Sequence, residues 1–130
     1  MTKTSSLGEL QLAILRVLWG CGEATASDVH AALHAERGLA PTTIATMLKK
    51  MEKRGLVTHR EDGRRFIYRS AVTEEAVTRS MVADLTDRLF DGKASELVGH
   101  LLAEHDIDRS ELAELNRLVS QAERRRKDRS

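Results

Sequence analysis

Threonines and lysines recur at helical spacing between Pro41 and Leu56, and their side chains are suited to binding duplex DNA. Threonine hydroxyls are short enough to reach base edges or phosphates in a groove, and lysine ammonium groups neutralise phosphates. The same pattern also fits an ordinary solvated helix, because runs of charge on helices are common. The candidate DNA-binding residues of this segment are Thr42, Thr43, Thr46, Lys49, Lys50 and Lys53.

This segment carries the signals of a helix over about residues 41–55. Proline is tolerated at the first helical position, where its missing N–H would have no intrahelical partner. Gly55 follows the last periodic residue, where a left-handed cap is favoured. Ile44, Leu48 and Met51 fall at spacings of four and three. This spacing predicts one buried stripe opposite the threonines and lysines.

Two helices are expected before this one. Apolar residues at helical spacing predict the first over about residues 7–19, with Gly20 and Gly22 ending it. The second starts after Thr25 or Ser27, either of which can cap it with a side-chain oxygen. The connection to the helix at residue 41 is short, so these two helices are expected to cross steeply.

The hydrophobic period changes from 3.6 to 2 after Gly55, which predicts a β-hairpin. Residues 56–60 and 65–69 each form a short strand rich in β-branched and aromatic residues. Asp62-Gly63 marks the turn between them, and residues 23–25 can add a brief edge strand. Three helices followed by a hairpin are the order of a winged helix-turn-helix, whose wing can reach phosphates or the minor groove. The basic residues of this wing, at about 60–65, are Arg60, Arg64 and Arg65.

Charge is divided unevenly along the chain. Residues 1–70 contain 11 Lys/Arg and 7 Asp/Glu, a net charge of +4, whereas residues 71–130 contain 10 and 13, a net charge of −3. The segment 124–130 has five bases and one acid, and without it the net charge of the second half, residues 71–123, is −7. We therefore expect double-stranded DNA, a polyanion, to bind the first half.

The second half returns to helical periodicity and predicts helices at about 73–90, 94–104 and from 108 or 110 to 119. They total about 45 residues, too few to bury their apolar stripes in a core of their own. Packing of two copies into a symmetric dimer would bury these stripes; folding back onto the first half is the alternative. The expected dimerisation residues are Met81, Leu85, Leu89, Leu97, Leu101, Leu102, Leu112, Leu115 and Val119.

The predicted fold class is mainly α with a small β-hairpin. We expect a winged-helix DNA-binding domain over residues 1–71, a helical dimerisation region over 72–123 and a disordered basic tail over 124–130. No run approaches the roughly 18 apolar residues that a membrane span needs, and the N-terminus lacks the apolar segment of a signal peptide. A cytoplasmic location without a membrane partner is therefore expected.

Other chemistry has weaker support in the sequence. His30 and His34 are four residues apart, as two zinc ligands can be, and Cys21 lies upstream. Zinc sites usually need three or four protein ligands, and the residue after His30 is Ala31, not the glutamate of a zinc-protease motif. We therefore predict no metal and no cofactor. No phosphate-binding loop or nucleophile motif occurs, so no enzyme is predicted.

Six sequence motifs follow one another between about residue 7 and residue 119. They are Gly8-Glu-Leu-Gln, Ile14-Leu-Arg-Val-Leu-Trp19, Thr43-Ile-Ala-Thr-Met-Leu-Lys-Lys-Met-Glu-Lys-Arg-Gly-Leu56, Gly63-Arg-Arg-Phe-Ile-Tyr68, Leu97-Val-Gly-His-Leu-Leu and Glu111-Leu-Ala-Glu-Leu. In this ordered set the chain resembles the penicillinase repressor family of bacterial transcription regulators. The last two motifs are similar to the dimerisation region of that family.

The resemblance implies a homodimeric repressor that occupies palindromic operators. It places Thr43, Thr46 and Lys50 where the recognition helix of the family meets DNA, and it matches Arg64 and Arg65 to the wing. Thr42 occupies a site where some relatives carry lysine.

Two features of the family are missing from the sequence. The paired Cys-x-Cys motifs of the copper-sensing branch do not occur in this chain. The Asn-Phe pair at which some relatives are cleaved, after a sensor protein is triggered, is absent from Gly99-His100-Leu101. The sequence therefore leaves open whether an inducing protease or sensor protein is a partner of this chain.

Two other functions fit parts of the sequence. A winged helix with a basic face can bind an acidic protein instead of DNA, and Cys21 or the histidines can make a regulator responsive to thiol oxidation or metal. The sequence leaves these alternatives open.

Overall fold

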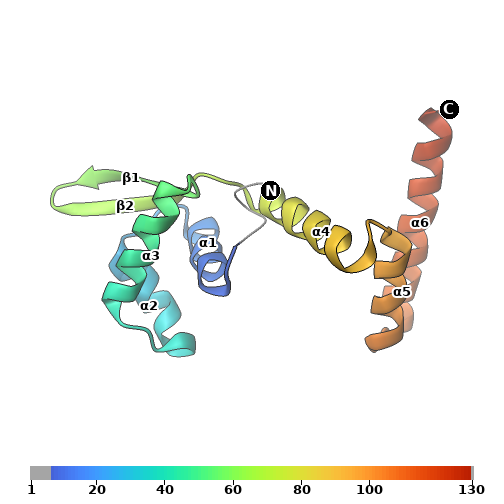
Figure 1. Cartoon of the computed structure of the whole chain (residues 1–130), viewed down its shortest axis with the longest axis horizontal. Coiled ribbons are helices and arrows are strands. Elements are labelled where there is room, and N and C mark those ends of the chain that lie inside the picture. The colour runs from blue at the N-terminus through green and yellow to red at the C-terminus, as the bar shows by residue number, and fades with distance from the viewer. Residues whose placement is uncertain (1–6, 130) are drawn as a thin grey trace.

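The computed structural model describes residues 7–129 of the chain, which contain six helices and one two-stranded antiparallel sheet. This architecture confirms the predicted fold class (Figure 1). In chain order the elements are α1 (Glu9–Cys21), α2 (Ala26–Arg37), α3 (Pro41–Lys53), β1 (Val57–Asp62), β2 (Arg65–Ser70), α4 (Glu74–Phe90), α5 (Ala94–Glu104) and α6 (Arg109–Arg129).

The first two helices differ slightly from their predicted limits. α1 starts two residues later than expected because Gly8 precedes it as the cap, and the Gly8 N–H donates to the Gln11 side chain at 3.1 Å. α1 also continues through Gly20 to Cys21 and is capped by Gly22, whose φ of 85° is a backbone angle that glycine adopts without strain. Thr25, not Ser27, caps α2.

The core of the N-terminal half lies between α1, α2, α3 and the hairpin. Ile44, Leu48 and Met51 of α3 are fully buried, which confirms the predicted stripe. The chain then leaves the helix at Gly55, whose φ is 79°, and Leu56 returns directly to the core. Burial of this stripe therefore determines which side of α3 faces the solvent.

The hairpin turn lies one residue later than the Asp-Gly signal indicates. Asp62 pairs with Arg65, so the two-residue loop is Gly63-Arg64. Gly63, with a φ of 66°, occupies the first central position, which type II′ turns reserve for glycine. The expected edge strand consists of a single bridge between Ala24 and Tyr68.

Two glycines give a matched test of this backbone geometry. We expect Gly63→Ala to lower the free energy of unfolding by about 1–2 kcal/mol, because a Cβ is strained at positive φ. We expect Gly20→Ala, inside α1 with no atom within 4 Å of the added Cβ, to raise it by about 0.5–1 kcal/mol. Urea unfolding measures both changes, and a stabilised Gly63→Ala variant would contradict the turn assignment.

Trp19 holds the segment that connects β2 to α4. Its indole N–H donates to the Val72 carbonyl at 2.9 Å and lies 3.1 Å from the Ser70 hydroxyl oxygen. Val77, in the first turn of α4, is buried in the core against which Trp19 packs. Trp19 therefore joins α1 to the segment that leads into α4.

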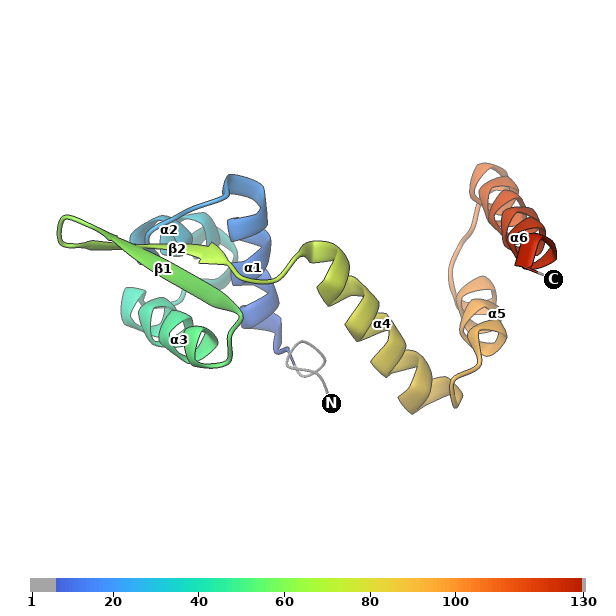
Figure 2. The same ribbon diagram turned by 90° about the horizontal axis from the view of Figure 1, so that it is seen from above.

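The second half of the chain extends away from this core. Figures 1 and 2 show α4 leading outward and α5 and α6 at the far end of the protomer. The alternative of folding back onto the first half is therefore wrong for α5 and α6. Met81, expected at the dimer interface, instead packs partly buried against the N-terminal core.

The prediction of a disordered tail is wrong for residues 124–129, because α6 continues to Arg129. Arginine, lysine and glutamate are good helix formers, and no glycine or proline interrupts this segment. Cations near the C-terminus also interact favourably with the helix dipole. Ser130 lies outside the described residues. No helix within residues 7–129 is long and apolar enough to cross a membrane.

Candidate nucleic-acid interface

All six predicted residues of α3 are exposed and lie on one face of the helix. At 3.6 residues per turn, Thr46 lies near the middle of this face, directly opposite the buried stripe. Thr43 and Lys50 lie on one side of Thr46, and Lys49 lies on the other. The structure thus brings the predicted residues together as a continuous row of hydroxyl and ammonium groups. The row consists of Thr42, Thr43, Thr46, Lys49, Lys50 and Lys53.

The two flanks of this row are different. On one flank, Arg54 donates to the Gln11 side chain of α1 at 3.0 Å, which ties the C-terminal end of α3 to α1. On the other flank, Lys49 lines a groove of about 520 Å³ together with Ser27 of α2 and Arg65 of the wing. The row on α3 and the wing therefore line the same groove.

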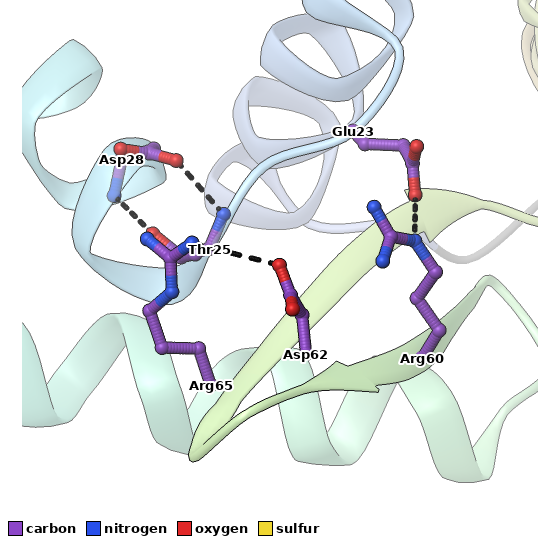
Figure 3. A network of polar contacts seen from close by, with 6 residues as sticks. All are labelled: Glu23, Thr25, Asp28, Arg60, Asp62 and Arg65. Atoms are coloured by element: carbon purple, nitrogen blue, oxygen red, sulfur yellow. Dashed lines mark hydrogen bonds and ion pairs between the residues drawn. The ribbon is translucent and has the colours of Figure 1, made fainter.

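The predicted wing residues Arg64 and Arg65 are exposed at the hairpin tip. Arg65 lies 3.8 Å from the Asp62 carboxylate, an exposed contact that adds little stability (Figure 3). Both guanidinium groups remain accessible to a phosphate.

Arg60, the third basic residue of the wing, makes a closer contact with an acid. Its Nε donates to Glu23 at 2.8 Å, so it holds the wing to the segment after α1 (Figure 3). The Arg60 hydrogen bond also lowers the pKa of the Glu23 carboxyl below its usual value. No sequence pattern predicts this pair, because its members are 37 residues apart.

The start of α2 is held by a reciprocal cap. The Asp28 N–H donates to the Thr25 hydroxyl, and the Thr25 N–H donates to the Asp28 carboxylate, both at 3.1 Å (Figure 3). The backbone N–H of Thr25 is the main reason that the pKa of Asp28 is lowered, with a smaller contribution from the positive charge of Arg65. This cap fixes the third wall of the groove beside Lys49.

A second pair links α3 to the wing. Nδ1 of His59 in β1 lies 2.7 Å from a carboxylate oxygen of Glu52, and the His59 ring stacks on Phe66 with centroids 4.1 Å apart. Glu52 is the single acid of α3, and this contact turns it toward the hairpin. Sequence patterns did not predict this contact, which depends on how the hairpin packs.

The predicted dimerisation residues other than Met81 lie outside the core. Leu89 is 70% exposed and Leu101 is 41% exposed, and no residue of α5 or α6 is buried. Of the large apolar side chains that are exposed within residues 7–129, Phe66 alone lies in the first half. The others are Val82, Leu85, Leu89, Val98, Leu101, Leu102, Leu112, Leu118 and Val119; Leu97 and Leu115 are half-buried.

The candidate metal and thiol residues do not form a larger cluster. The rings of His30 and His34 are 5.1 Å apart, but His30 Nε2 is hydrogen-bonded to the Leu39 carbonyl at 2.7 Å. Cys21 is exposed, and its thiol lies 3.0 Å from the Val17 carbonyl. Within residues 7–129, no three His, Cys, Asp or Glu side chains are placed to hold a metal ion.

Comparison with known sequences gives matches over most of the chain. The sequence model of the penicillinase repressor family matches residues 7–121. The penicillinase repressor of Bacillus licheniformis is 23% identical over 128 residues, covering 98% of this chain and 100% of the relative. The transcriptional regulator BlaI of Mycobacterium tuberculosis is 34% identical over 85 residues, covering 65% of this chain and 62% of the relative.

Comparison with solved structures identifies the same kind of DNA-binding domain. The solution structure of the DNA-binding domain of the repressor BlaI is 28% identical, with a TM-score of 0.50. It covers 57% of this chain and 90% of that domain. A MarR family protein from Bacillus stearothermophilus, at 19% identity and a TM-score of 0.50 over 94% of this chain, shares the fold.

Proposed function

Because the chain belongs to the penicillinase repressor family, we propose that it is a DNA-binding transcriptional repressor that acts as a homodimer. Each protomer places α3 in a major groove of a palindromic operator, and the wing contacts the adjacent backbone or minor groove. The two half-sites then lie about one helical turn apart or a multiple of it. This is a binding function, without an enzymatic one.

The observation that carries the proposal is the row of hydroxyls and ammonium groups on α3. Its members are all exposed, although the opposite face of the same helix is fully buried. Glu52, the one acid of α3, is engaged by His59 at the hairpin, which leaves the row positively charged. A polyanion therefore meets only hydroxyls and cations along this face.

Position along the row assigns different roles to its members. Thr46 lies at the centre, where a side chain in a groove comes nearest to the base edges. Lys49 and Arg65 lie together on the wing side, where a cation meets the phosphate backbone. Base reading by Thr42, Thr43 and Thr46 and phosphate binding by Lys49, Lys50, Lys53, Arg64 and Arg65 are therefore our assignments.

The dimer is supported by the apolar residues of α4, α5 and α6. A single protomer leaves most of these side chains exposed to water, at a cost of about 25 cal/mol for each Å² of apolar surface. A groove of about 370 Å³ between α5 and α6, lined by Leu101, Leu102, Ile107 and Leu115, offers a place for side chains of a second copy. We therefore assign the two-fold interface to these helices.

The base-reading role is tested with Thr46→Ala. The probes are genomic duplexes enriched by binding to the wild-type protein, and a random-sequence duplex. We expect Thr46→Ala to reduce the preference for the enriched duplexes about fivefold, the effect of losing roughly one hydrogen bond of 1 kcal/mol. Thr78→Ala, an exposed threonine of α4, serves as the matched control and should leave the preference unchanged.

Three outcomes distinguish the proposal from its alternatives. Equal loss of affinity for enriched and random duplexes in Thr46→Ala would overturn the base-reading role. Failure of the wild-type protein to bind either duplex below about 100 μM, the weak end of unspecific binding, would favour an acidic protein partner instead. A preference for the enriched duplexes that oxidant or zinc abolishes would indicate a responsive regulator.

A further inference from the structure

A dense group of cations lies at the end of α6. The match to the family model ends at residue 121, whereas α6 continues to Arg129. We call residues 124–129 the basic helix end. Its cations, all of them exposed, are Arg124, Arg125, Arg126, Lys127 and Arg129, and its one acid is Asp128.

The basic helix end lies at the opposite end of the protomer from α3 and the wing (Figure 1). At 1.5 Å per residue, its six residues span about 9 Å of helix axis and carry five cations. Duplex DNA carries one phosphate charge per about 1.7 Å of its own axis. The charge per unit length of the basic helix end is thus about as high as that of a duplex, and opposite in sign.

Four of these cations differ from three arginines elsewhere in α4 and α6. Each of those three pairs with an acid about one turn away: Arg79 with Glu75, Arg88 with Asp84, and Arg117 with Glu114. Within residues 7–129, no salt bridge reaches Arg124, Arg125, Lys127 or Arg129. Like charges three and four residues apart on a helix repel one another. A bound polyanion would remove this repulsion.

The helix dipole explains only part of the arrangement. Its negative end favours cations in the last turn, which accounts for a basic residue or two near Arg129. Four successive cations at 124–127 point in all directions around the axis, since each residue turns by about 100°. Such an arrangement presents positive charge whichever side of the helix faces a partner.

We propose that the basic helix end is a second, sequence-independent binding surface for duplex DNA. The inference rests on the proposed function in taking duplex DNA as the polyanion. No apolar residue occurs in 123–130, so this segment lacks the apolar face that a helix needs to lie in a membrane surface. This second surface would hold the repressor on DNA outside its half-sites, where phosphate contacts alone supply the affinity.

The test compares two variants that each remove three cations from the second half of the chain. R124Q/R125Q/K127Q removes cations of the basic helix end, and R79Q/R88Q/R117Q removes cations that are paired with acids. The probe is a random-sequence duplex, titrated at several salt concentrations. For the first variant, we expect the slope of log K against log salt to become shallower by up to about 2.7, which is 0.9 for each phosphate that is no longer neutralised. The second variant should keep the wild-type slope.

Two results would overturn the inference. One is an unchanged slope and affinity in R124Q/R125Q/K127Q, with circular dichroism showing that the helices are retained. The other is that the wild-type protein binds anionic lipid vesicles through its basic helix end, while that end contributes nothing to duplex binding. Preference for enriched over random duplexes reports on α3 and should persist in this variant. Failure of the proposed function and failure of this inference are therefore seen in different measurements.

Discussion

Replacing Lys49, Lys50 and Lys53 together with glutamine is expected to weaken binding to duplex DNA roughly a hundredfold, taking about 1 kcal/mol for each phosphate contact. The loss should affect enriched and random duplexes alike, because phosphates carry no sequence information. The salt dependence should become shallower by about 2.7 in the log–log slope. Fluorescence anisotropy titrations at several salt concentrations measure both effects.

The triple lysine variant should remain folded, which makes the loss interpretable. All three lysines are exposed, and surface substitutions usually change stability by less than about 0.5 kcal/mol. The paired-arginine variant R79Q/R88Q/R117Q removes the same amount of charge far from α3 and should bind nearly as the wild type does. Equal weakening by both variants would show that net charge, and not the face of α3, governs binding.

The second large effect is expected at the assigned dimer interface. Leu101→Glu combined with Leu115→Glu places two charges in the groove between α5 and α6. Burying these charges against a second copy is costly, so the variant should be monomeric at micromolar concentration. Affinity for a palindromic operator should then fall by about 10²–10⁴, the gain that linking two binding units supplies. Sedimentation equilibrium and DNA titration measure the two consequences.

The same helices offer a matched control. Ala103→Glu and Ala113→Glu add the same charge at exposed positions, each on the side of its helix opposite the apolar stripe. This double variant should remain dimeric and bind normally. A monomeric control, or a dimeric Leu101→Glu/Leu115→Glu variant, would contradict the assignment of the interface.

Local sequence signals predicted the part of the fold that depends on neighbours along the chain. The helix predicted over about residues 41–55 follows from Pro41, Gly55 and a stripe at spacings of three and four. It is observed over residues 41–53, and all three stripe residues are buried. The motif resemblance is confirmed by the family match over residues 7–121. The hairpin turn lay one residue away from its predicted place, because Gly63 can serve at either central position of a turn.

Contacts between distant residues could not be predicted in this way. Arg60 was grouped with the DNA-facing wing residues, but its position opposite Glu23 depends on how the hairpin packs beside α2. Met81 has the spacing of an interface residue, but its place in the first turns of α4 brings it to the N-terminal core. Charge composition favoured disorder after Glu123, whereas the helix propensity of the same residues continues α6.

α4 makes few contacts with the rest of the chain, so its length affects how α3 is placed relative to the helices at the far end. Beyond Val77 no residue of α4 is buried within one protomer, and the helix, about 25 Å long, separates the N-terminal core from α5 and α6 (Figure 2). One inserted residue would turn each α3 by about 100° relative to the helices at the far end, so the two copies in the proposed dimer would no longer face the same side of a duplex. Seven inserted residues, close to two whole turns, would restore the phase and lengthen the reach by about 10 Å. In the proposed dimer, the length of α4 would therefore limit which operator spacings the two α3 helices can reach.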